Sequence, residues 1–386
     1  MKKALLMTWF NTPNYGTLLQ CDATVSLFKE RYNIVLDVAN YNPIGKRDAK
    51  SIIKKILSFR TWKRRFRMVI GKIKQASEIE GFRKKQEMVN DFIRHYSFAL
   101  NGNRIVTDND FKELNEKYDV FVSGSDQIWN PDFLNERYLL DFVDENKQCI
   151  SVSSSISKRE IDEKLIEVYK KSLCKYLAIT VREEDSVKLI EKITGMKAWA
   201  ILDPTLLYGS EGWQRKQIKN KEKDYVLAYI LGTSEEIRNC IVQLSSITQK
   251  DMYYFPHMDG MFTKADAILG KRGKALWGES PYKWIGWISN ATLIITDSFH
   301  MTVFSIMLHR DFLVVPKEEN SSSQNNRILN ILRKVGLEDR FIKREEIIQR
   351  YNCLKEIDWN NVDNIINKER NASLQILDDI VKRINW

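Results

Sequence analysis

The chain is poor in histidine and has no paired cysteines. It contains four histidines and five cysteines among 386 residues. The cysteines are scattered singly, without a Cys-x-x-Cys pair, and their odd number fits neither a disulfide framework nor a zinc site. We therefore expect a protein of the reducing cytoplasm that holds no metal. The cysteines are Cys21, Cys149, Cys174, Cys240 and Cys353.

Long apolar runs are also missing. The opening residues 1–10 combine two lysines with a brief apolar run, but Asn11 and Pro13 interrupt it before a signal-peptide core can form. No stretch of about 18 uncharged apolar residues follows, so no segment is predicted to span a bilayer. We interpret residues 3–9 as a first β-strand.

Basic residues outnumber acidic ones. There are 61 Lys and Arg residues against 51 Asp and Glu, which gives a formal net charge of +10. This excess favours anionic partners such as phosphates, nucleic acid or an acidic membrane surface, and it does not choose among them. The hydrophobic content of 43% is that of a folded globular protein, and the length suffices for two domains with separate cores.

Short apolar runs alternate with longer amphipathic stretches, as in βαβ units around a parallel sheet. A lysine-rich stretch at 216–223 separates two such halves. The sequence therefore predicts an α/β protein with two Rossmann-like doubly wound domains facing a cleft. The expected domains are 1–215 and 216–358, with a last helix in 359–386 that packs across both. The expected strands are 3–9, 34–38, 119–122, 149–153, 176–181, 225–231, 252–255, 293–296 and 312–315.

A basic insert interrupts the first half at about 46–100. Its residues 46–74 contain twelve Lys or Arg and a single acid, Asp48. Apolar side chains fall three or four apart, so a helix here would carry one apolar stripe flanked by basic side chains. Two interpretations stay open. The helix attaches to an anionic membrane surface with Trp62 and Phe66 at the lipid boundary, or its stripe packs on the first domain.

One histidine stands where a predicted strand ends. The segment IITDSFHMTVFSI, residues 294–306, places His300 between a buried strand and an amphipathic helix, beside Asp297 and Ser298. Doubly wound sheets bind ligands at the carboxyl ends of their strands. His300 is therefore a candidate for acid–base chemistry, although a core histidine bonded to Asp297 would also fit this position.

Small and polar residues follow another predicted strand, in DVFVSGSDQIWNP at 119–131. Such residues fill a core poorly and hydrogen-bond hydroxyl groups well. Asp126 is a candidate general base or sugar-hydroxyl acceptor, or alternatively a helix N-cap, and Trp129 could offer a flat face to a sugar ring. Asn14 and Gly16 lie in a turn before a helix, where the backbone either approaches a ligand or only starts the helix.

Two arginines lie close to predicted helix starts. Arg182, in TVREEDS, follows a strand, and Arg327, in SSSQNNRILNILR, opens a helix. A guanidinium at the carboxyl edge of a sheet can hold a carboxylate or phosphate bidentately, or it can pair with a neighbouring acid such as Glu183. A cation near a helix amino end opposes the helix dipole, which suggests that the Arg327 position serves a ligand.

These motifs together resemble the polysaccharide pyruvyl transferase family. They occur in family order and cover the chain from residue 11 to about 340. The chain departs from the pattern at 298–300, where many relatives have Arg-Leu-His instead of Ser-Phe-His, and at Met301, where a glycine is common. The matching elements are N-Y-G-T-L at 14–18, S-G-S-D-Q-I-W-N-P at 123–131, V-R-E-x-x-S at 181–186, D-P-T-L-L at 203–207, T-D-S-F-H at 296–300 and N-R-I at 326–328.

The resemblance implies a fold like that of the GT-B glycosyltransferases. It also implies transfer of pyruvate from phosphoenolpyruvate to a sugar of a cell-surface polysaccharide, or to its lipid-linked or nucleotide-linked precursor. The product would be a ketal and phosphate would be released, with no cofactor and no metal. We expect a cytoplasmic location, peripheral to the inner face of the cell membrane, and no nucleic-acid partner. A glycosyltransferase with a nucleotide-sugar donor and a non-catalytic glycan-binding relative remain alternatives.

The resemblance places His300, Arg182 and Arg327 around phosphoenolpyruvate. Asp126 is a second candidate for the proton transfers, and the sequence does not assign them to His300 rather than to Asp126 or Asp297. Ser298 and Asp297 complete the expected donor site. The residues expected to bind the acceptor are Asn14, Gly16, Ser123, Gly124, Ser125, Gln127 and Trp129.

Overall fold

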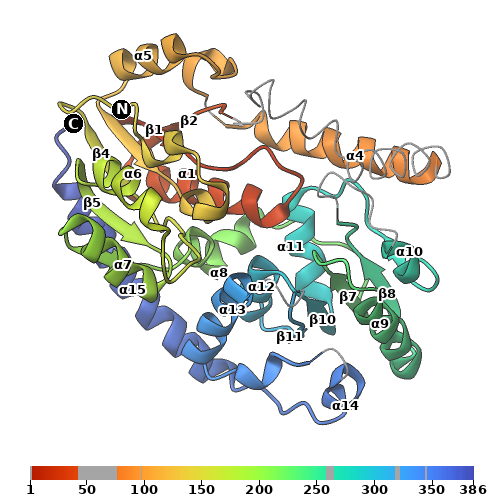
Figure 1. Cartoon of the computed structure of the whole chain (residues 1–386). Helices are drawn as coiled ribbons and strands as arrows, with labels where there is room; N and C mark the ends of the chain where they lie inside the picture. Colours follow the sequence, from red (N-terminus) through yellow and green to blue (C-terminus); the bar gives the residue numbers. More distant parts are fainter. Residues whose placement is uncertain (1, 42–75, 97, 258–264, 318–321, 344–345) are drawn as a thin grey trace.

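Two parallel β-sheets organise the chain (Figure 1). The structure, a computed structural model, describes residues 2–41, 76–96, 98–257, 265–317, 322–343 and 346–386. The first sheet has six strands in the order β2-β1-β3-β4-β5-β6, and the second has five in the order β11-β10-β7-β8-β9. Their bounds are β1 Lys2–Met7, β2 Ile34–Val38, β3 Val120–Ser123, β4 Gln148–Ser151, β5 Tyr176–Val181, β6 Ala198–Ala200, β7 Tyr225–Tyr229, β8 Asp251–Tyr254, β9 Lys274–Ala275, β10 Leu293–Thr296 and β11 Asp311–Val314.

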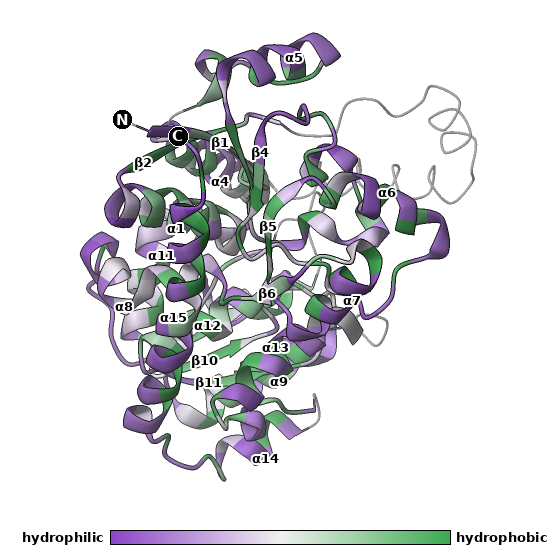
Figure 2. Cartoon of the chain, turned by 90° about the vertical axis from the view of Figure 1, so that its left-hand side faces the viewer, coloured by the Kyte–Doolittle hydropathy of each residue, from purple (hydrophilic) through white to green (hydrophobic). Residues whose placement is uncertain are grey.

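Helices cover the faces of these sheets, and the strands lie inside as the more hydrophobic layer (Figure 2). Strands buried on both faces read as continuous apolar runs, as β10 does with four fully or nearly fully buried residues. The helices are α1 Tyr15–Tyr32, α4 Ala76–Ile93, α5 Asp108–Lys117, α6 Glu163–Leu173, α7 Glu184–Thr194, α8 Pro204–Lys216, α9 Glu235–Thr248, α10 Asp266–Leu269, α11 Pro281–Asn290, α12 Phe299–Met307, α13 Ser322–Lys334, α14 Ile347–Tyr351 and α15 Trp359–Lys382.

The predicted fold class, two doubly wound α/β units, is confirmed. The two shortest strands, β6 and β9, were not predicted from the sequence, because two or three residues carry no readable alternation. The predicted boundary at 215–216 falls at the end of α8. The last helix, α15, contacts both halves: Asp363 bonds to His309 of the second, and the Ser373 hydroxyl accepts from the Leu202 N–H of the first.

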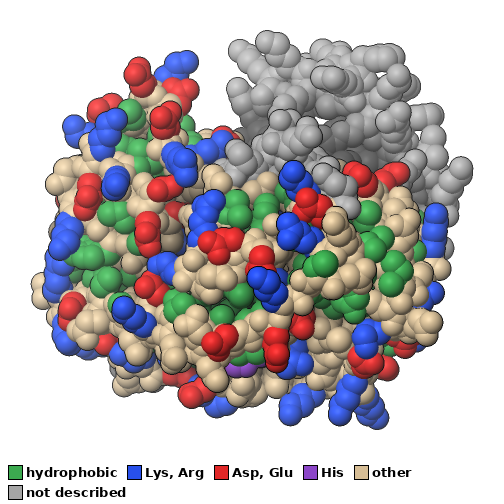
Figure 3. All heavy atoms as spheres, turned by 90° about the horizontal axis from the view of Figure 1, so that it is seen from below, with side chains coloured by type: hydrophobic (Ala, Val, Ile, Leu, Met, Phe, Trp, Pro, Cys, Tyr) green, Lys and Arg blue, Asp and Glu red, His purple; other side chains and the backbone are tan. Residues whose placement is uncertain are grey.

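Helix α4 is the described part of the basic insert, and it bridges the two halves. Phe92 of α4 packs edge-on against Tyr282, and Gly81 lies so close to the Trp277 ring that a Cβ would approach it to 2.3 Å. The basic helix predicted over 46–74 lies outside the described residues. Within the part of the chain that the structure describes, no helix is both long and apolar enough to cross a bilayer. On the described part of the face in Figure 3, basic and acidic side chains are interspersed.

A buried lysine of α4 makes stability depend on pH. Lys85 is 1% exposed, and burial lowers its pKa from the usual 10.5 to about 7. Between pH 7 and 10.5 the unfolded chain binds a proton that the folded chain lacks, so the free energy of unfolding rises with pH across this window. We expect Lys85→Met to stabilise the protein most at and below pH 7, with the difference shrinking by pH 10. Chemical denaturation at pH 7, 8.5 and 10 measures this, with the exposed neighbour variant Lys84→Met as control. A gap between wild type and Lys85→Met that does not change with pH would contradict it.

Candidate functional site

His300 lies at the junction of the two halves, in the first turn of α12. Strand β10 ends at Thr296, and the Ser298 hydroxyl caps α12 by accepting from the Met301 N–H at 3.4 Å. The His300 side chain is 8% exposed, and its Nε2 has no hydrogen-bond partner among the described residues. The nearest acid oxygen is Oδ2 of Asp203, at 3.8 Å, which is too long for a hydrogen bond. A buried imidazole nitrogen is thus left available to a ligand.

Gly16 of α1 supports the other edge of the imidazole. A Cβ added at Gly16 would stand 2.1 Å from Nδ1 and 2.4 Å from Cγ of His300. The glycine is required for this close approach between the two halves. The Asn14 side chain, expected to bind the acceptor, instead caps α1 by accepting from the Gly16 N–H at 3.0 Å.

Alanine at position 16 tests this contact. In a helix, Gly→Ala ordinarily stabilises by about 0.5–1 kcal/mol. Here we expect the opposite sign, together with a loss of activity of about 10²-fold, because the methyl group must displace His300 by an ångström or more. Gly195→Ala is the matched control: its Cβ would meet nothing within 4 Å, but its φ of +70° makes it costly for stability only. Full activity in Gly16→Ala would show that His300 does not need this position.

Arg182 is held by acids at the carboxyl end of β5. Its Nη1 donates to Asp203 Oδ2 at 2.9 Å, and its Nε donates to Glu183 Oε1 at 3.4 Å. The side chain is 4% exposed, and Nη2 has no partner among the described residues. Burial would lower the pKa of Arg182, but the charges of Glu183, Asp203 and Asp126 raise it above its usual value. One face of a permanently charged guanidinium therefore remains open to a ligand.

Arg327 of α13 lies near Arg182 and has no ion pair among the described residues. Both guanidinium carbons lie over the Phe299 ring, at 4.8 Å for Arg182 and 5.8 Å for Arg327. With the Gln127 amide oxygen turned toward it, Arg327 donates to this oxygen through Nη1 at 3.0 Å and Nε at 3.2 Å. Burial and repulsion by Arg182 lower the pKa of Arg327 to about 10. A bound anion would relieve this repulsion.

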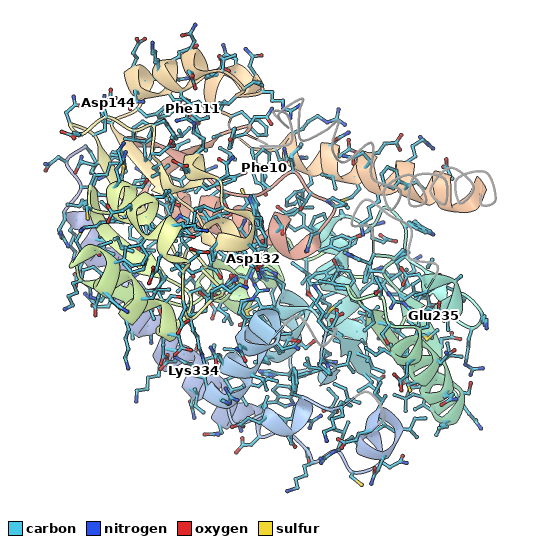
Figure 4. All side chains as sticks on the ribbon, viewed as in Figure 1. Phe10, Phe111, Asp132, Asp144, Glu235 and Lys334 are labelled. Atoms are coloured by element: carbon cyan, nitrogen blue, oxygen red, sulfur yellow. The ribbon has the colours of Figure 1, made fainter. Side chains whose placement is uncertain are left out.

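The two arginines line a pocket of about 440 Å³ between the halves. Phe299 and Asp203 form part of its wall, and Glu369 and Ser373 of α15 line another side. At its edge, Lys334 of α13 donates to Glu184 of α7 at 2.9 Å and also pairs with Glu369 of α15. Figure 4 shows Lys334 where these three helices meet. We call this space the arginine pocket.

Asp203 joins the arginine pocket to His300. Its Oδ1 accepts from the Thr205 N–H at 2.9 Å and from the Thr205 hydroxyl at 2.7 Å, which caps α8. Its Oδ2 accepts from Arg182 and faces His300. Burial would raise the pKa of Asp203, but His300, Arg182 and the Thr205 bonds hold it well below its usual range. Asp203 is therefore a permanent anion that can orient the imidazole.

Asp126 has a strained backbone, with φ 73° and ψ −177°. Non-glycine residues in this region cost about 1–3 kcal/mol and cluster at functional sites. Its Oδ1 accepts from the Gln127 N–H and its Oδ2 accepts from the Thr17 hydroxyl, both at 2.8 Å. The N-cap alternative for Asp126 therefore holds, and the strained turn directs Gln127 toward Arg327.

The other residues expected to bind the acceptor lie in the core. Trp129 is fully buried, and its Nε1 donates to the Ser123 hydroxyl and to the Tyr138 carbonyl, each at 3.0 Å. Its ring offers no face to a sugar in this structure. Ser125 donates to the Ser153 carbonyl at 2.9 Å, and a Cβ at Gly124 would approach that of Thr8 to 2.7 Å. These residues therefore belong to the packed core that supports the site.

Asp297, expected to bind the donor, holds two loops of the second half together. Its carboxylate accepts from the Leu231 and Gly232 N–H groups, both at 2.7 Å. Burial raises the pKa of Asp297 above its usual value, although these bonds and nearby cations oppose the shift. Asp297 and Ser298 both have internal partners and position the first turn of α12.

Asp203, Glu183, Thr17 and Phe299 are the neighbours of His300 and the arginines that sequence reasoning did not assign to the site. The signal for Asp203 was present, because D-P-T-L-L at 203–207 is one of the matching motifs. Its role could not be read, because its partners are 21 positions and nearly one hundred positions away along the chain. Among the described residues, no group of three or more His, Cys, Asp or Glu side chains is arranged to hold a metal ion.

Several solved structures have a similar fold. A putative UDP-N-acetylglucosamine 2-epimerase from Listeria monocytogenes aligns with a TM-score of 0.56 at 9% identity, covering 100% of this chain and 98% of its own. The UDP-GlcNAc 2-epimerase from Neisseria meningitidis, bound to UDP-GlcNAc, gives 0.55 at 11% identity, covering 99% and 100%. MnaA of S. aureus with UDP gives 0.54 at 10%, covering 95% and 91%. At these identities the likeness shows the GT-B-type fold alone.

Family comparison covers most of the sequence. A search among curated proteins finds no match. The family described as polysaccharide pyruvyl transferase matches residues 14–317, which include Gly16, Arg182, Asp203 and His300. The chain is therefore a transferase that belongs to the polysaccharide pyruvyl transferase family.

Proposed function

We propose that this transferase moves pyruvate from phosphoenolpyruvate to two hydroxyls of a sugar, forms a ketal and releases phosphate. The acceptor we propose is a cell-surface polysaccharide or its lipid-linked or nucleotide-linked precursor. The observation that carries the proposal is the pair of guanidinium groups over Phe299, from the buried side chain of Arg182 and the half-buried Arg327. Near them is a buried imidazole nitrogen that has no hydrogen-bond partner among the described residues.

The donor fits the charges of the arginine pocket. Phosphoenolpyruvate carries a carboxylate and a phosphate a few atoms apart, and each can accept a forked pair of hydrogen bonds. Arg182 has an open Nη2, and Arg327 has no carboxylate bonded to it among the described residues. Two guanidiniums in one pocket repel each other until an anion binds. The arginine of the Arg-Leu-His pattern is absent, so Arg182 and Arg327 are the arginines that contact Phe299.

The reaction needs two proton movements. A proton is delivered to the methylene carbon of phosphoenolpyruvate, which becomes a methyl group and leaves an oxocarbenium at C2. The first sugar hydroxyl adds to C2, the C2–O bond to phosphate breaks, and the second hydroxyl adds to close the ketal. Of the two hydroxyl protons, one replaces the proton given to the methylene carbon and one leaves with phosphate. We assign the first transfer to His300 Nε2, with Asp203 stabilising the charged imidazole.

The proposal extends to where the enzyme acts and to how its acceptor is carried. We propose that the enzyme acts in the cytoplasm at the inner face of the membrane, where the basic insert would bring it to a lipid-linked acceptor. The UDP named for the S. aureus structure and the UDP-GlcNAc named for the Neisseria structure fit a nucleotide-linked acceptor equally well. No cofactor is proposed.

Phosphate release tests this function. The full chain is incubated with phosphoenolpyruvate and a panel of galactose, glucose, mannose and N-acetylmannosamine acceptors, free, nucleotide-linked and lipid-linked. Acceptor-dependent release with a product that gains the mass of a pyruvyl ketal is expected. Release of UDP from a UDP-sugar, with no use of phosphoenolpyruvate, would instead establish a glycosyltransferase. Binding of phosphoenolpyruvate without turnover with any acceptor would favour a glycan-binding relative.

A further inference from the structure

A second group of basic side chains lies outside the arginine pocket. It forms where the carboxyl ends of β8 and β11 lead to His257 and Lys317, with Lys85 of α4 packed behind them. Arg238 of α9 completes the group, because its charge acts on His257 together with those of both lysines. We call Lys85, Arg238, His257 and Lys317 the basic edge. Carboxyl ends of parallel strands are where doubly wound sheets bind ligands.

Lys85 brings to the basic edge a buried amine whose pKa of about 7 leaves it only partly charged at neutral pH. Its Nζ donates to the Pro256 carbonyl at 2.9 Å and stands 5.1 Å from the centre of the Tyr15 ring. Its nearest acid is Asp266, which already accepts from Arg238 Nε at 2.8 Å and from the His257 N–H at 3.0 Å. A buried ammonium with only a carbonyl and a ring face as partners is costly. An anion nearby would offset this cost.

Two described acids near the basic edge are committed to internal bonds. Asp266 binds Arg238, and Asp297 binds the Leu231 and Gly232 N–H groups. Burial and the charges of Lys85, Lys317 and Arg238 lower the pKa of His257 to about 3, so its imidazole is neutral and can donate one hydrogen bond. The edge therefore combines a positive field with a neutral donor.

The basic edge and the arginine pocket meet at the first turn of α12. Phe299 faces the two arginines, whereas Asp297, two residues earlier, faces Leu231 and Gly232. The Cβ position of Gly232 lies 3.8 Å from Lys317 Cγ. On the N-terminal half, Tyr15 carries Lys85 on its ring, and the next residue contacts His300. Lys85 and His300 thus contact adjacent residues of α1, Tyr15 and Gly16, which links the basic edge to the His300 side of the site.

We propose that the basic edge binds a diphosphate that carries the acceptor sugar, so that the sugar hydroxyls reach His300 while phosphoenolpyruvate occupies the arginine pocket. This inference rests on the proposed pyruvyl transfer. Lys317 and His257 contact the diphosphate. The buried Lys85 and Arg238 do not touch it and act on it only through their electrostatic field. The shared chemistry is the diphosphate, which links sugars both to nucleotides and to lipids. An acceptor without phosphate would not use this edge.

The test measures binding to the full chain by calorimetry with three probes: UDP, farnesyl diphosphate and inorganic pyrophosphate. Lys317→Gln and His257→Gln are each expected to weaken binding of the diphosphate probes about ten- to hundredfold, because each removes one charge-assisted or buried hydrogen bond. Binding of phosphoenolpyruvate should stay unchanged. Lys271→Gln, an exposed lysine of the same half, is the control. Binding of UDP alone indicates a nucleotide-linked acceptor, and binding of farnesyl diphosphate alone indicates a lipid-linked one.

Two results would overturn the inference. One is no binding of any diphosphate probe. The other is equal binding by wild type and both variants, or weakened phosphoenolpyruvate binding in their place, which would make the edge part of the donor site. A failure of pyruvyl transfer looks different: diphosphate binding that depends on Lys317 would persist, while phosphoenolpyruvate would yield no phosphate with any acceptor.

Discussion

Replacing His300 with glutamine is expected to lower acceptor-dependent phosphate release about 10²- to 10⁴-fold, the usual contribution of a positioned general acid or base. Glutamine fills much of the same space and can hydrogen-bond, but it cannot deliver a proton at neutral pH. Binding of phosphoenolpyruvate should persist, because Arg182 and Arg327 remain in place. The rate is measured by phosphate release, and donor binding by the rise in Tm that phosphoenolpyruvate causes.

His309→Gln is the matched control for this experiment. His309 stacks on Trp359 and bonds to Asp363 at 2.9 Å, away from the arginine pocket, so its replacement should leave turnover unchanged. Turnover of His300→Gln within a few-fold of wild type would remove His300 from the chemistry. Asp126 would not take its place easily, because both of its carboxylate oxygens already accept hydrogen bonds.

Replacing either arginine is expected to weaken donor binding, but the two replacements should affect the stability of the protein differently. Arg182→Met leaves Asp203 and Glu183 buried without their cation, so the free energy of unfolding should fall by about 3–5 kcal/mol. Arg327→Met removes a cation that Arg182 repels, so the free protein should be no less stable than wild type. Either change should weaken the binding of phosphoenolpyruvate at least about 30-fold, because each removes a cation that would pair with the bound anion.

Urea denaturation with and without phosphoenolpyruvate measures both effects. In the wild type, the donor should raise the free energy of unfolding in proportion to the logarithm of its concentration above Kd. Arg94→Met, which changes an exposed arginine outside the pocket, is the control. An Arg182→Met protein as stable as wild type would show that the acids are solvated after all. Wild-type donor affinity in Arg327→Met would place the donor elsewhere.

Much of the fold was readable along the chain because its signals are local. The runs at 34–38, 176–181 and 293–296 match β2, β5 and β10 to the residue, since strands buried on both faces are continuous apolar segments. The site was readable in part for the same reason. His300 and Arg182 directly follow strands, and the carboxyl ends of parallel strands collect at one edge.

The roles of several predicted residues were not readable. Trp129 and Ser123 stand in the same motif as Asp126, but their hydrogen bonds to each other and to Tyr138 turn them into the core. Asn14 and Ser298 look like ligands and act as helix caps. A polar side chain at a strand end serves either purpose, and only its partners in space decide which.

By itself the sequence determined the alternation of strands and helices, the family motifs and the position of His300 at a helix start, because these depend on neighbours within a few residues. Tertiary structure alone decided that Asp203 stands between Arg182 and His300, that Gly16 must lack a side chain, and that Arg327 has no ion pair among the described residues. The contacts of Asp203 and Gly16 join residues from 21 positions apart, for Arg182 and Asp203, to 284 positions apart, for Gly16 and His300. Their energies arise from burial and from charge, and neither exists in the chain until the two sheets pack together.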